Sequence, residues 1–159
     1  MIKNTCITEE CKMTPYAVHH PSLRAILSDA LGVPREALNV HLWIVAGVPV
    51  DIIYKLAALV ETDVGVICKL AGISRSTVAR RLRKNIPLSI SQSARVYGVV
   101  RALEAALSLH KHNTARALSW LHRPAWGLGG VTPATLLATQ MGVQAVVDLV
   151  GRIRHGAYQ

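Results

Sequence analysis

A cluster of arginines preceded by a serine stands out in the middle of this chain. Residues 73–84 read Ile-Ser-Arg-Ser-Thr-Val-Ala-Arg-Arg-Leu-Arg-Lys, and they lie inside a stretch, 64–103, that contains no Asp or Glu. That stretch carries eight Lys or Arg residues, so no carboxylate near them in the sequence offsets their charge. A basic helix that begins at a serine after a glycine turn is an element that proteins present to duplex DNA. These residues therefore predict nucleic-acid binding.

The side chains that usually carry catalysis or bind metals are scattered. His110 and His112 point apart on a helix, so they cannot share a metal ion as an i, i+4 pair could. Cys6 and Cys11 have no second cysteine pair near them, and Cys68 fits a small buried thiol. The nine carboxylates show no spacing that suits acid–base catalysis outside the first ten residues. The sequence predicts a binding protein that is not an enzyme and has no metal and no cofactor.

A helix-turn-helix is predicted over residues 64–84. This motif needs a small residue where its two helices cross, a glycine in the turn and apolar residues that lock the second helix. The small residue, the turn glycine and the two locking residues are, in that order, Cys68, Gly72, Ile73 and Val78. Arg81, with Leu82 beside it, stands where a further apolar residue is usual. The pattern thus has either one mismatch or a register shifted by one residue.

The first turns of the second helix would face base edges if that helix lies in the major groove. We predict that Arg75 and Arg80 read bases, because arginine can bond guanine through two donors. The residues expected to contact phosphates are Arg83, Lys84 and the hydroxyls of Ser74 and Ser76. The alternative is a solvated basic helix in an ordinary helical bundle, which the turn glycine and the missing carboxylates disfavour.

Composition agrees with a helical protein that binds polyanions. The 159 residues are 51% hydrophobic, which excludes a disordered chain, and the formal net charge is +9. The longest apolar run, near 42–50, is interrupted by Gly47 and Pro49 and is too short to span a membrane. Charged residues near the N-terminus disfavour a secretion signal, and three cysteines do not form a disulfide framework. We expect a cytoplasmic protein without a membrane segment.

Helical periodicity runs through most of the chain, and no strand pattern appears, which predicts an all-α fold. The predicted helices are Ser22–Leu31, Arg35–Ala46, one capped by Asp51, one from Asp63 to Ala71, one capped by Ser74, Ser91–His110, Thr114–Leu121, one starting at Thr132-Pro133, and Val143–Ile153 after a break at Gly142. In the second of these, the residues expected to face inward are Leu38, Leu42, Val45 and Ala46. We predict a loose leader over 1–20, a helical domain with the helix-turn-helix over 21–111, and a small helical module over 112–159.

The C-terminal third carries the most specific motifs. They read Ala117-Leu118-Ser119-Trp120-Leu121-His122-Arg123-Pro124, Leu128-Gly129-Gly130-Val131-Thr132-Pro133, Leu136-Leu137-Ala138-Thr139 and the ending Ile153-Arg154-His155-Gly156-Ala157-Tyr158. From Gly47 to the end, the chain resembles Xre-type antitoxins that carry the toxin-binding domain shared by the Xre, ParS and MbcA antitoxins. It departs from that family at Ala125, where Asn is usual, and at Ser76, where Arg is common.

The resemblance implies one half of a type II toxin–antitoxin pair. The partner would be a Res-domain toxin that is encoded next to this chain and consumes NAD. The chain would form a homodimer, bind the toxin through its C-terminal domain and repress its operon by binding operator DNA. In such complexes the C-terminal end lies at the entrance of the toxin's active site. The residues implied in toxin binding are Trp126, Arg154, His155, Gly156, Ala157, Tyr158 and Gln159.

Two other functions stay open from the residues. The chain could be a freestanding helix-turn-helix transcription regulator whose C-terminal module serves only for dimerisation. It could also neutralise a protein partner without binding DNA, because of the departures at Ser76 and Arg81. Trp120 is predicted to lie in the core, while Trp126, in a glycine-rich loop, fits packing and partner contact equally well. A frayed terminus is the plain alternative for the last six residues.

Overall fold

A computed structural model describes residues 26–156, and every regular element in this range is a helix. The α-helices are α1 (Ile26–Leu31), α2 (Ala37–Ala46), α3 (Asp51–Leu59), α4 (Val64–Ala71), α5 (Arg75–Arg83), α6 (Ile90–Leu109), α7 (Thr114–Leu121), α8 (Pro133–Leu136) and α9 (Gln140–Arg154), with a 3-10 helix, η2 (Trp126–Leu128). The all-α prediction is confirmed. The predicted leader over 1–20 lies outside the described residues.

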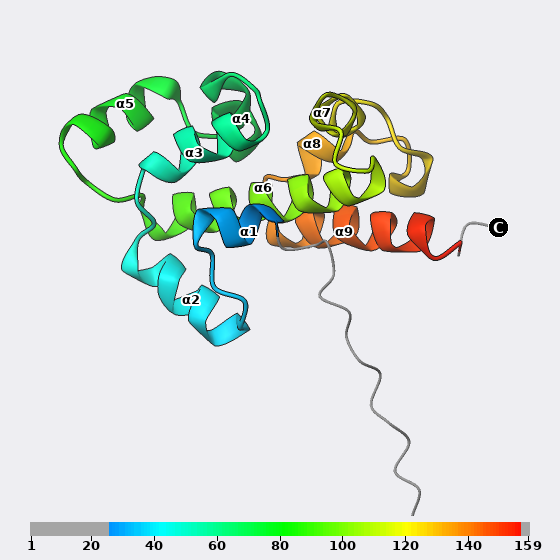
Figure 1. Cartoon of the computed structure of the whole chain (residues 1–159), viewed down its shortest axis with the longest axis horizontal. Coiled ribbons are helices and arrows are strands. Elements are labelled where there is room, and N and C mark those ends of the chain that lie inside the picture. Colours follow the sequence, from blue (N-terminus) through cyan, green and yellow to red (C-terminus); the bar gives the residue numbers. More distant parts are fainter. Residues whose placement is uncertain (1–25, 157–159) are drawn as a thin grey trace, which may run out of the picture.

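The long helix α6 is the axis of the molecule. Figure 1 shows α3, α4 and α5 on one side of its N-terminal half, while α7 and α8 lie by its C-terminal half and α9 runs alongside it. Gly98 permits the close approach of α9, since a Cβ there would lie 2.9 Å from a methyl carbon of Val143. The helix-turn-helix and the C-terminal module are therefore built onto one shared scaffold.

One continuous apolar core joins the two halves. Helix α6 supplies fully buried Val96, Val99, Val100 and Leu103 to it. The helices α3 and α4 add Ile53, Leu56 and Ile67 to the same cluster, and the C-terminal helices add Leu121, Val143 and Val146. Because burial of these side chains is the main stabilising term, α4 is fixed by its packing on α6, and α5 in turn packs on α4.

Several helices, but not all, start at a polar cap that the sequence carries. Asp63 accepts a hydrogen bond from the Gly65 N–H at 2.7 Å, as predicted for this cap. Asp51, in contrast, is the first helical residue of α3 and pairs with Lys55 one turn later at 2.8 Å. The long helix begins after a capping box of Ser89 with Gln92, two residues before the predicted Ser91.

Gly142 is not a helix break. It lies inside α9, where an added Cβ would collide with the backbone of Leu136. The glycine is needed because α8 passes directly against the first turn of α9, so close packing rather than backbone freedom explains it. The helix starts at Thr139, whose hydroxyl accepts from the Gly142 N–H at 3.1 Å.

The prediction of which α2 residues face inward is wrong. Leu38, Leu42 and Val45 are 67%, 55% and 46% exposed, and Ala46 is also exposed. The helix packs on α6 through the opposite side, where Val40 is buried. Nearly every residue of α2 is apolar, so the sequence period could not distinguish its buried face from its exposed one.

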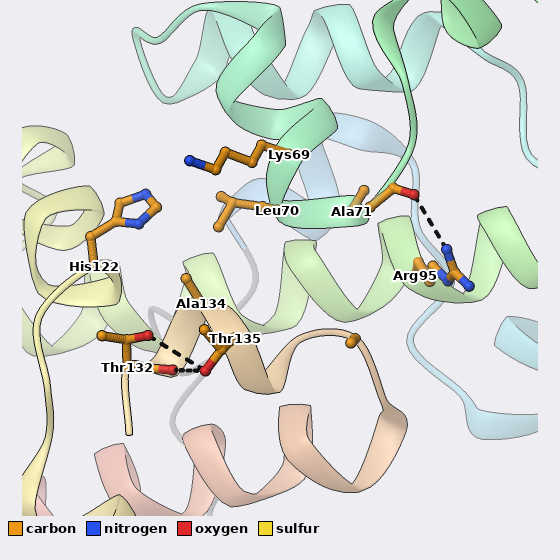
Figure 2. Close-up of a pocket in the computed structure, with 10 residues that line it drawn as sticks. Lys69, Leu70, Ala71, Arg95, His122, Thr132, Ala134 and Thr135 are labelled. Carbon is orange, nitrogen blue, oxygen red and sulfur yellow. Dashed lines mark hydrogen bonds between the residues drawn. The ribbon is translucent and has the colours of Figure 1, made fainter. Parts of the chain in front are cut away.

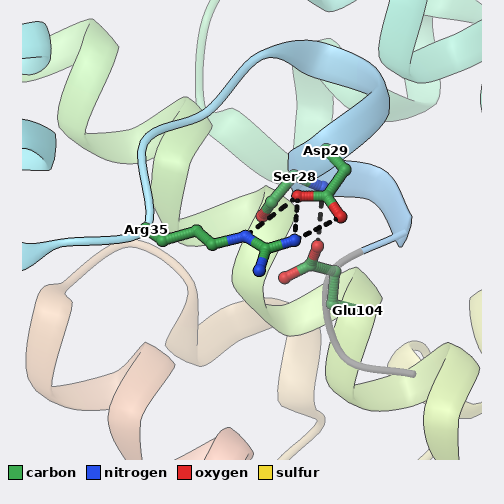
Figure 3. A network of polar contacts seen from close by, with 4 residues as sticks. All are labelled: Ser28, Asp29, Arg35 and Glu104. Carbon is green, nitrogen blue, oxygen red and sulfur yellow. Dashed lines mark hydrogen bonds and ion pairs between the residues drawn. The ribbon is translucent and has the colours of Figure 1, made fainter. Parts of the chain in front are cut away.

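Polar contacts hold α1 against α6 at the start of the described chain. The Ser28 backbone N–H donates to Glu104 Oε1 at 2.7 Å, and the Arg35 guanidinium pairs with Asp29 at 2.7 Å (Figure 3). Burial raises the pKa of the Glu104 carboxyl, an effect that the Ser28 N–H opposes and the nearby Asp29 charge reinforces.

Candidate functional site

Helices α4 and α5 form the predicted helix-turn-helix. Gly72 takes up a left-handed conformation, with φ at +62°, and the Ile73 N–H donates to the Cys68 carbonyl at 2.9 Å. Cys68, Ile73 and Val78 are all buried, so the three predicted apolar positions lock the second helix onto the first. Burial also raises the pKa of the Cys68 thiol, despite the opposing charge of Arg75. This thiol is a packing group.

The start of α5 is tightly organised. The Ser74 hydroxyl accepts from the Thr77 N–H at 3.2 Å and donates to the Thr77 hydroxyl at 2.8 Å. The Ser76 hydroxyl lies 3.2 Å from that of Ser74, and both serines are exposed. Arg75 forms an exposed ion pair with Asp63 at 3.2 Å, an interaction that water weakens. The structure thus brings three of the predicted DNA contacts, Ser74, Arg75 and Ser76, to one end of α5.

The other predicted DNA contacts lie further along α5. Arg80, Arg83 and Lys84 are exposed, and none forms an ion pair within the part of the chain that the structure describes. Arg81 behaves differently: its Nη1 donates to the Pro87 carbonyl at 2.6 Å, and its Nε is buried. Since Leu82 is exposed, the register is not shifted. Arg81 is the one mismatch, and it clamps the loop that follows α5.

A hollow of about 570 Å³ separates the helix-turn-helix from the C-terminal module. Lys69 and Arg95 line it from one side, and His122, Thr132 and Thr135 line it from the other. Figure 2 shows the Lys69 and His122 side chains reaching into it from opposite walls. Arg95 also donates to the Gly72 carbonyl at 3.3 Å and so supports the turn. This role of Arg95 has no signal in the sequence, because the contact joins residues 23 positions apart.

The C-terminal module exposes one of its tryptophans, Trp126, at one end. Trp126, in η2, is 94% exposed, the highest value among the exposed large hydrophobic residues of the described chain. The neighbouring Gly127 carbonyl accepts from Arg152 at 3.4 Å, which places this loop beside the last turns of α9. Ile153, also in that turn, is partly exposed. An exposed tryptophan with Arg152 beside its loop therefore lies near the end of α9.

The predicted tail residues continue from this end. Arg154, His155 and Gly156 are all exposed, and Arg154 Nη1 lies 3.5 Å from the Ser108 hydroxyl. Ala157, Tyr158 and Gln159 lie outside the described residues. Trp120 instead packs against the core, with its ring 6.2 Å from that of His110. Its predicted packing role agrees with this position, and burial lowers the pKa of His110.

Charge is distributed unevenly along the chain. Residues 64–156 contain thirteen Lys or Arg but only two carboxylates, Glu104 and Asp148, whereas the other seven carboxylates precede residue 64. In residues 26–156 there is no group of three or more His, Cys, Asp or Glu residues placed to hold a metal ion. No helix in this range is long and apolar enough to cross a membrane. The arrangement is that of a cationic, helical binding protein.

Comparison with known proteins agrees with this class. Residues 44–101 match the Antitoxin Xre-like helix-turn-helix domain, and residues 102–156 match the Antitoxin Xre/MbcA/ParS C-terminal toxin-binding domain. The chain is 34% identical to an Antitoxin Xre of Photorhabdus laumondii over 69% of its own length and 74% of the relative's. It is 30% identical to an Antitoxin Xre of Yersinia enterocolitica over 70% and 76% of the two lengths.

A third relative, from a Sphingobium strain, is called Prs ADP-ribosylating antitoxin and is 26% identical over 92% of this chain and 91% of that protein. The chain belongs to the Xre/MbcA/ParS antitoxin family, with a helix-turn-helix followed by the toxin-binding domain. It is a type II antitoxin, a binding protein and not an enzyme, and its two domains imply DNA and a cognate toxin as partners.

Proposed function

We propose that this antitoxin neutralises a Res-type, NAD-consuming toxin encoded next to it and represses its own operon as a cytoplasmic homodimer. The observation that carries the proposal is the separation of two exposed surfaces on one scaffold. The cations of α5 form one surface, and Trp126 with the end of α9 forms the other (Figure 1). One chain can therefore hold DNA and toxin at the same time.

The DNA surface is supported by what α5 leaves exposed. Val78 holds the helix in the core, while Arg75, Arg80 and Arg83 stay at the surface. Arginines at the first turns of such a helix reach base edges, and those further along reach phosphates. We assign Arg75 and Arg80 to bases, and Arg83, Lys84 and the Ser76 hydroxyl to phosphates. The Ser74 hydroxyl is already engaged as the helix cap, so its contribution to phosphate binding is the smaller one.

The toxin surface is supported by Trp126. A nearly fully exposed tryptophan beside a partly exposed isoleucine is the kind of anchor that dominates protein interfaces. Arg152, which donates to the Gly127 carbonyl next to Trp126, is exposed and favours an acidic partner surface. The tail that follows, through Gln159, is assigned to the entrance of the toxin's active site, as the family resemblance implies.

The identity of the toxin rests on the family and on one relative. The printed name of the Sphingobium protein joins an antitoxin to ADP-ribosylation, a reaction that consumes NAD. An NAD-consuming toxin for this chain agrees with that name. The freestanding regulator is the competing function, and Trp126 counts against it, because a module used only for dimerisation has no need of an exposed aromatic anchor beside an arginine.

Co-expression with the product of the neighbouring gene tests the proposal. The two chains should co-purify, and NAD loss caused by the toxin should stop in the presence of the antitoxin. A variant that lacks residues 154–159 tests the tail separately. At matched concentrations of complex it should still bind the toxin but leave part of the NAD consumption. Full suppression by the shortened chain would refute the assignment of the tail, and no effect of the full chain would refute the toxin.

A further inference from the structure

Helix α2 presents an apolar stripe to solvent. Leu38, Leu42 and Val45 recur at intervals of four and three residues, so they lie on one face of the helix. They are 67%, 55% and 46% exposed. The sequence from 37 to 50 contains no Asp, Glu, Lys or Arg. Figure 1 places α2 at an edge of the molecule, away from the C-terminal module.

This stripe leads to further exposed apolar residues. The Leu88 N–H donates to the Val48 carbonyl at 2.9 Å, which joins the segment after α2 to the loop after α5. At this junction, Leu82 and Ile86, both 44% exposed, line a hollow of about 190 Å³ with Pro49 and Val50. The polar residues Asp51, Arg81 and Asn85 line it as well. Ile90, 56% exposed, follows at the start of α6. We name the apolar edge as the following six residues: Leu38, Leu42, Val45, Leu82, Ile86 and Ile90.

The apolar edge is as large as the main apolar patch of a typical monomer, and such patches are often functional. At these exposed fractions, its six side chains leave on the order of 500 Å² of apolar surface uncovered, which reaches the range of the largest patch on a typical monomer. A standard interface buries about 800 Å² on each partner, so the edge would form more than half of one. We propose that the apolar edge is the contact between two copies of this chain.

Charge favours a second copy over a foreign partner on this face. Two chains of formal net charge +9 repel each other, so they associate most readily through a surface without charges, and the α2 stripe is one. The surface around Trp126 is less suited to a contact between two copies. In a symmetric contact there, Arg152 and Arg154 would face the same arginines of the other copy, and their charges would repel. That surface fits an acidic partner, whereas the neutral stripe fits its own copy.

The position of α5 agrees with this pairing. Its C-terminal end, at Leu82, belongs to the apolar edge, while its first turns, at Arg75, lie at the other end of the helix. A two-fold contact through the edge presents two copies of α5 and leaves their first turns free, as reading of a palindromic site requires. This part of the inference rests on the proposed DNA binding, whereas the contact face rests only on the proposed homodimer.

Sedimentation velocity on the full chain, alone in solution, tests the inference. The wild type should sediment as two chains, and the double variant Leu38→Glu/Leu42→Glu should sediment as one at the same concentration. Its dissociation constant should rise roughly 100-fold or more, because four carboxylates would meet across the contact. The matched control is Met141→Glu, at a residue of α9 that is 78% exposed and outside the apolar edge, and it should remain dimeric. Circular dichroism should show the same helix content for all three proteins.

A cross-link keeps the inference testable if the double variant misfolds. Leu42→Cys, in a chain whose Cys6 and Cys11 are replaced by serine, should form a covalent dimer with a short bis-maleimide, and Met141→Cys should not. Cys68 is buried and serves as an internal reference.

Three results would overturn the inference. A monomeric wild type would show that two copies do not pair through the edge. A double variant that stays dimeric would place the contact elsewhere, and equal cross-linking of the two cysteine variants would do the same. None of these measurements uses DNA or toxin. Failure of operator binding or toxin neutralisation would therefore refute the proposed function and leave the contact face standing.

Discussion

The surface of α5 consists of cations around a helix that Val78 anchors, whereas the end of the C-terminal module offers solvent a tryptophan that is 94% exposed. In the proposed function, the first surface would act through charge, which salt screens, and with little burial. The second would act through burial of an aromatic ring, which salt hardly changes. The difference teaches that two ligands can be separated by the kind of interaction that binds each of them, and four variants can break or sharpen this comparison.

Removal of Trp126 should have the largest effect. Trp126→Ala removes the main apolar anchor and should weaken toxin binding by about 2–4 kcal/mol, the loss typical of a tryptophan at the centre of an interface. Calorimetric titration of the purified toxin measures it. Operator binding should not change, since Trp126 lies outside the helix-turn-helix. A wild-type affinity for toxin in this variant would remove Trp126 from the interface.

Neutralisation of two cations on α5 should come next. Arg80→Ala/Arg83→Ala should weaken operator binding by roughly 1–3 kcal/mol for the base contact and lower the salt dependence by about one slope unit for the phosphate contact. Fluorescence anisotropy at several salt concentrations measures both. Arg116→Ala/Arg123→Ala removes the same charge from the C-terminal module and is the matched control. An unchanged affinity in the α5 variant, or an equal loss in the control, contradicts the assigned DNA face.

The turn glycine should have a moderate effect on stability. Gly72→Ala places a Cβ at a φ of +62° and should cost about 1–2 kcal/mol in the free energy of unfolding. Gly151→Ala is a control of opposite sign, because Gly151 lies in α9 with open space around its missing Cβ. That variant should gain up to about 1 kcal/mol. Urea unfolding followed by circular dichroism measures both, and equal shifts would contradict the role of the turn.

The Glu104 carboxyl should give the smallest effect. Burial raises its pKa above the usual 4.5, so the folded protein holds this proton to higher pH than the unfolded chain does. Its contribution to stability is complete below about pH 4.5 and is lost as the pH rises through the folded-state pKa. Glu104→Gln lacks this titration, so its melting temperature relative to the wild type should rise over that window, by the equivalent of about 1 kcal/mol or less. A difference in melting temperature between the two proteins that stays constant from about pH 4 to about pH 7 would contradict this expectation.

Local features of the fold were predictable where one residue type decides them. Gly72 was recognisable because a left-handed turn favours glycine, and Asp63 because a carboxylate can cap the first turn of a helix. The candidate site was predictable to the same extent: the exposed positions of Arg75, Arg80 and Arg83 follow from the period set by Val78. The assigned contacts to DNA and toxin stay predictions until the experiments above are done.

Features that depend on distant neighbours were not predictable. Gly142 has the residue type of a helix break, yet the backbone of Leu136 against it shows that it is a close-packing position. Arg81 stands at an apolar position because the Pro87 carbonyl is there to accept its hydrogen bond. The hydrogen bond from Arg95 to the Gly72 carbonyl connects α6 with the turn after α4, and neither segment alone predicts it from its sequence.

By itself, the sequence determined the helical class, the helix-turn-helix and its cationic face, because period, cap and charge are properties of neighbouring residues. Only the tertiary structure decided which side of α2 faces water and which tryptophan is free. Leu42 and Val40 are equally apolar, as are Trp120 and Trp126, so their own chemistry cannot order them. Which of these side chains is buried depends on the element that packs against it. That element, most often α6, lies far away in the sequence.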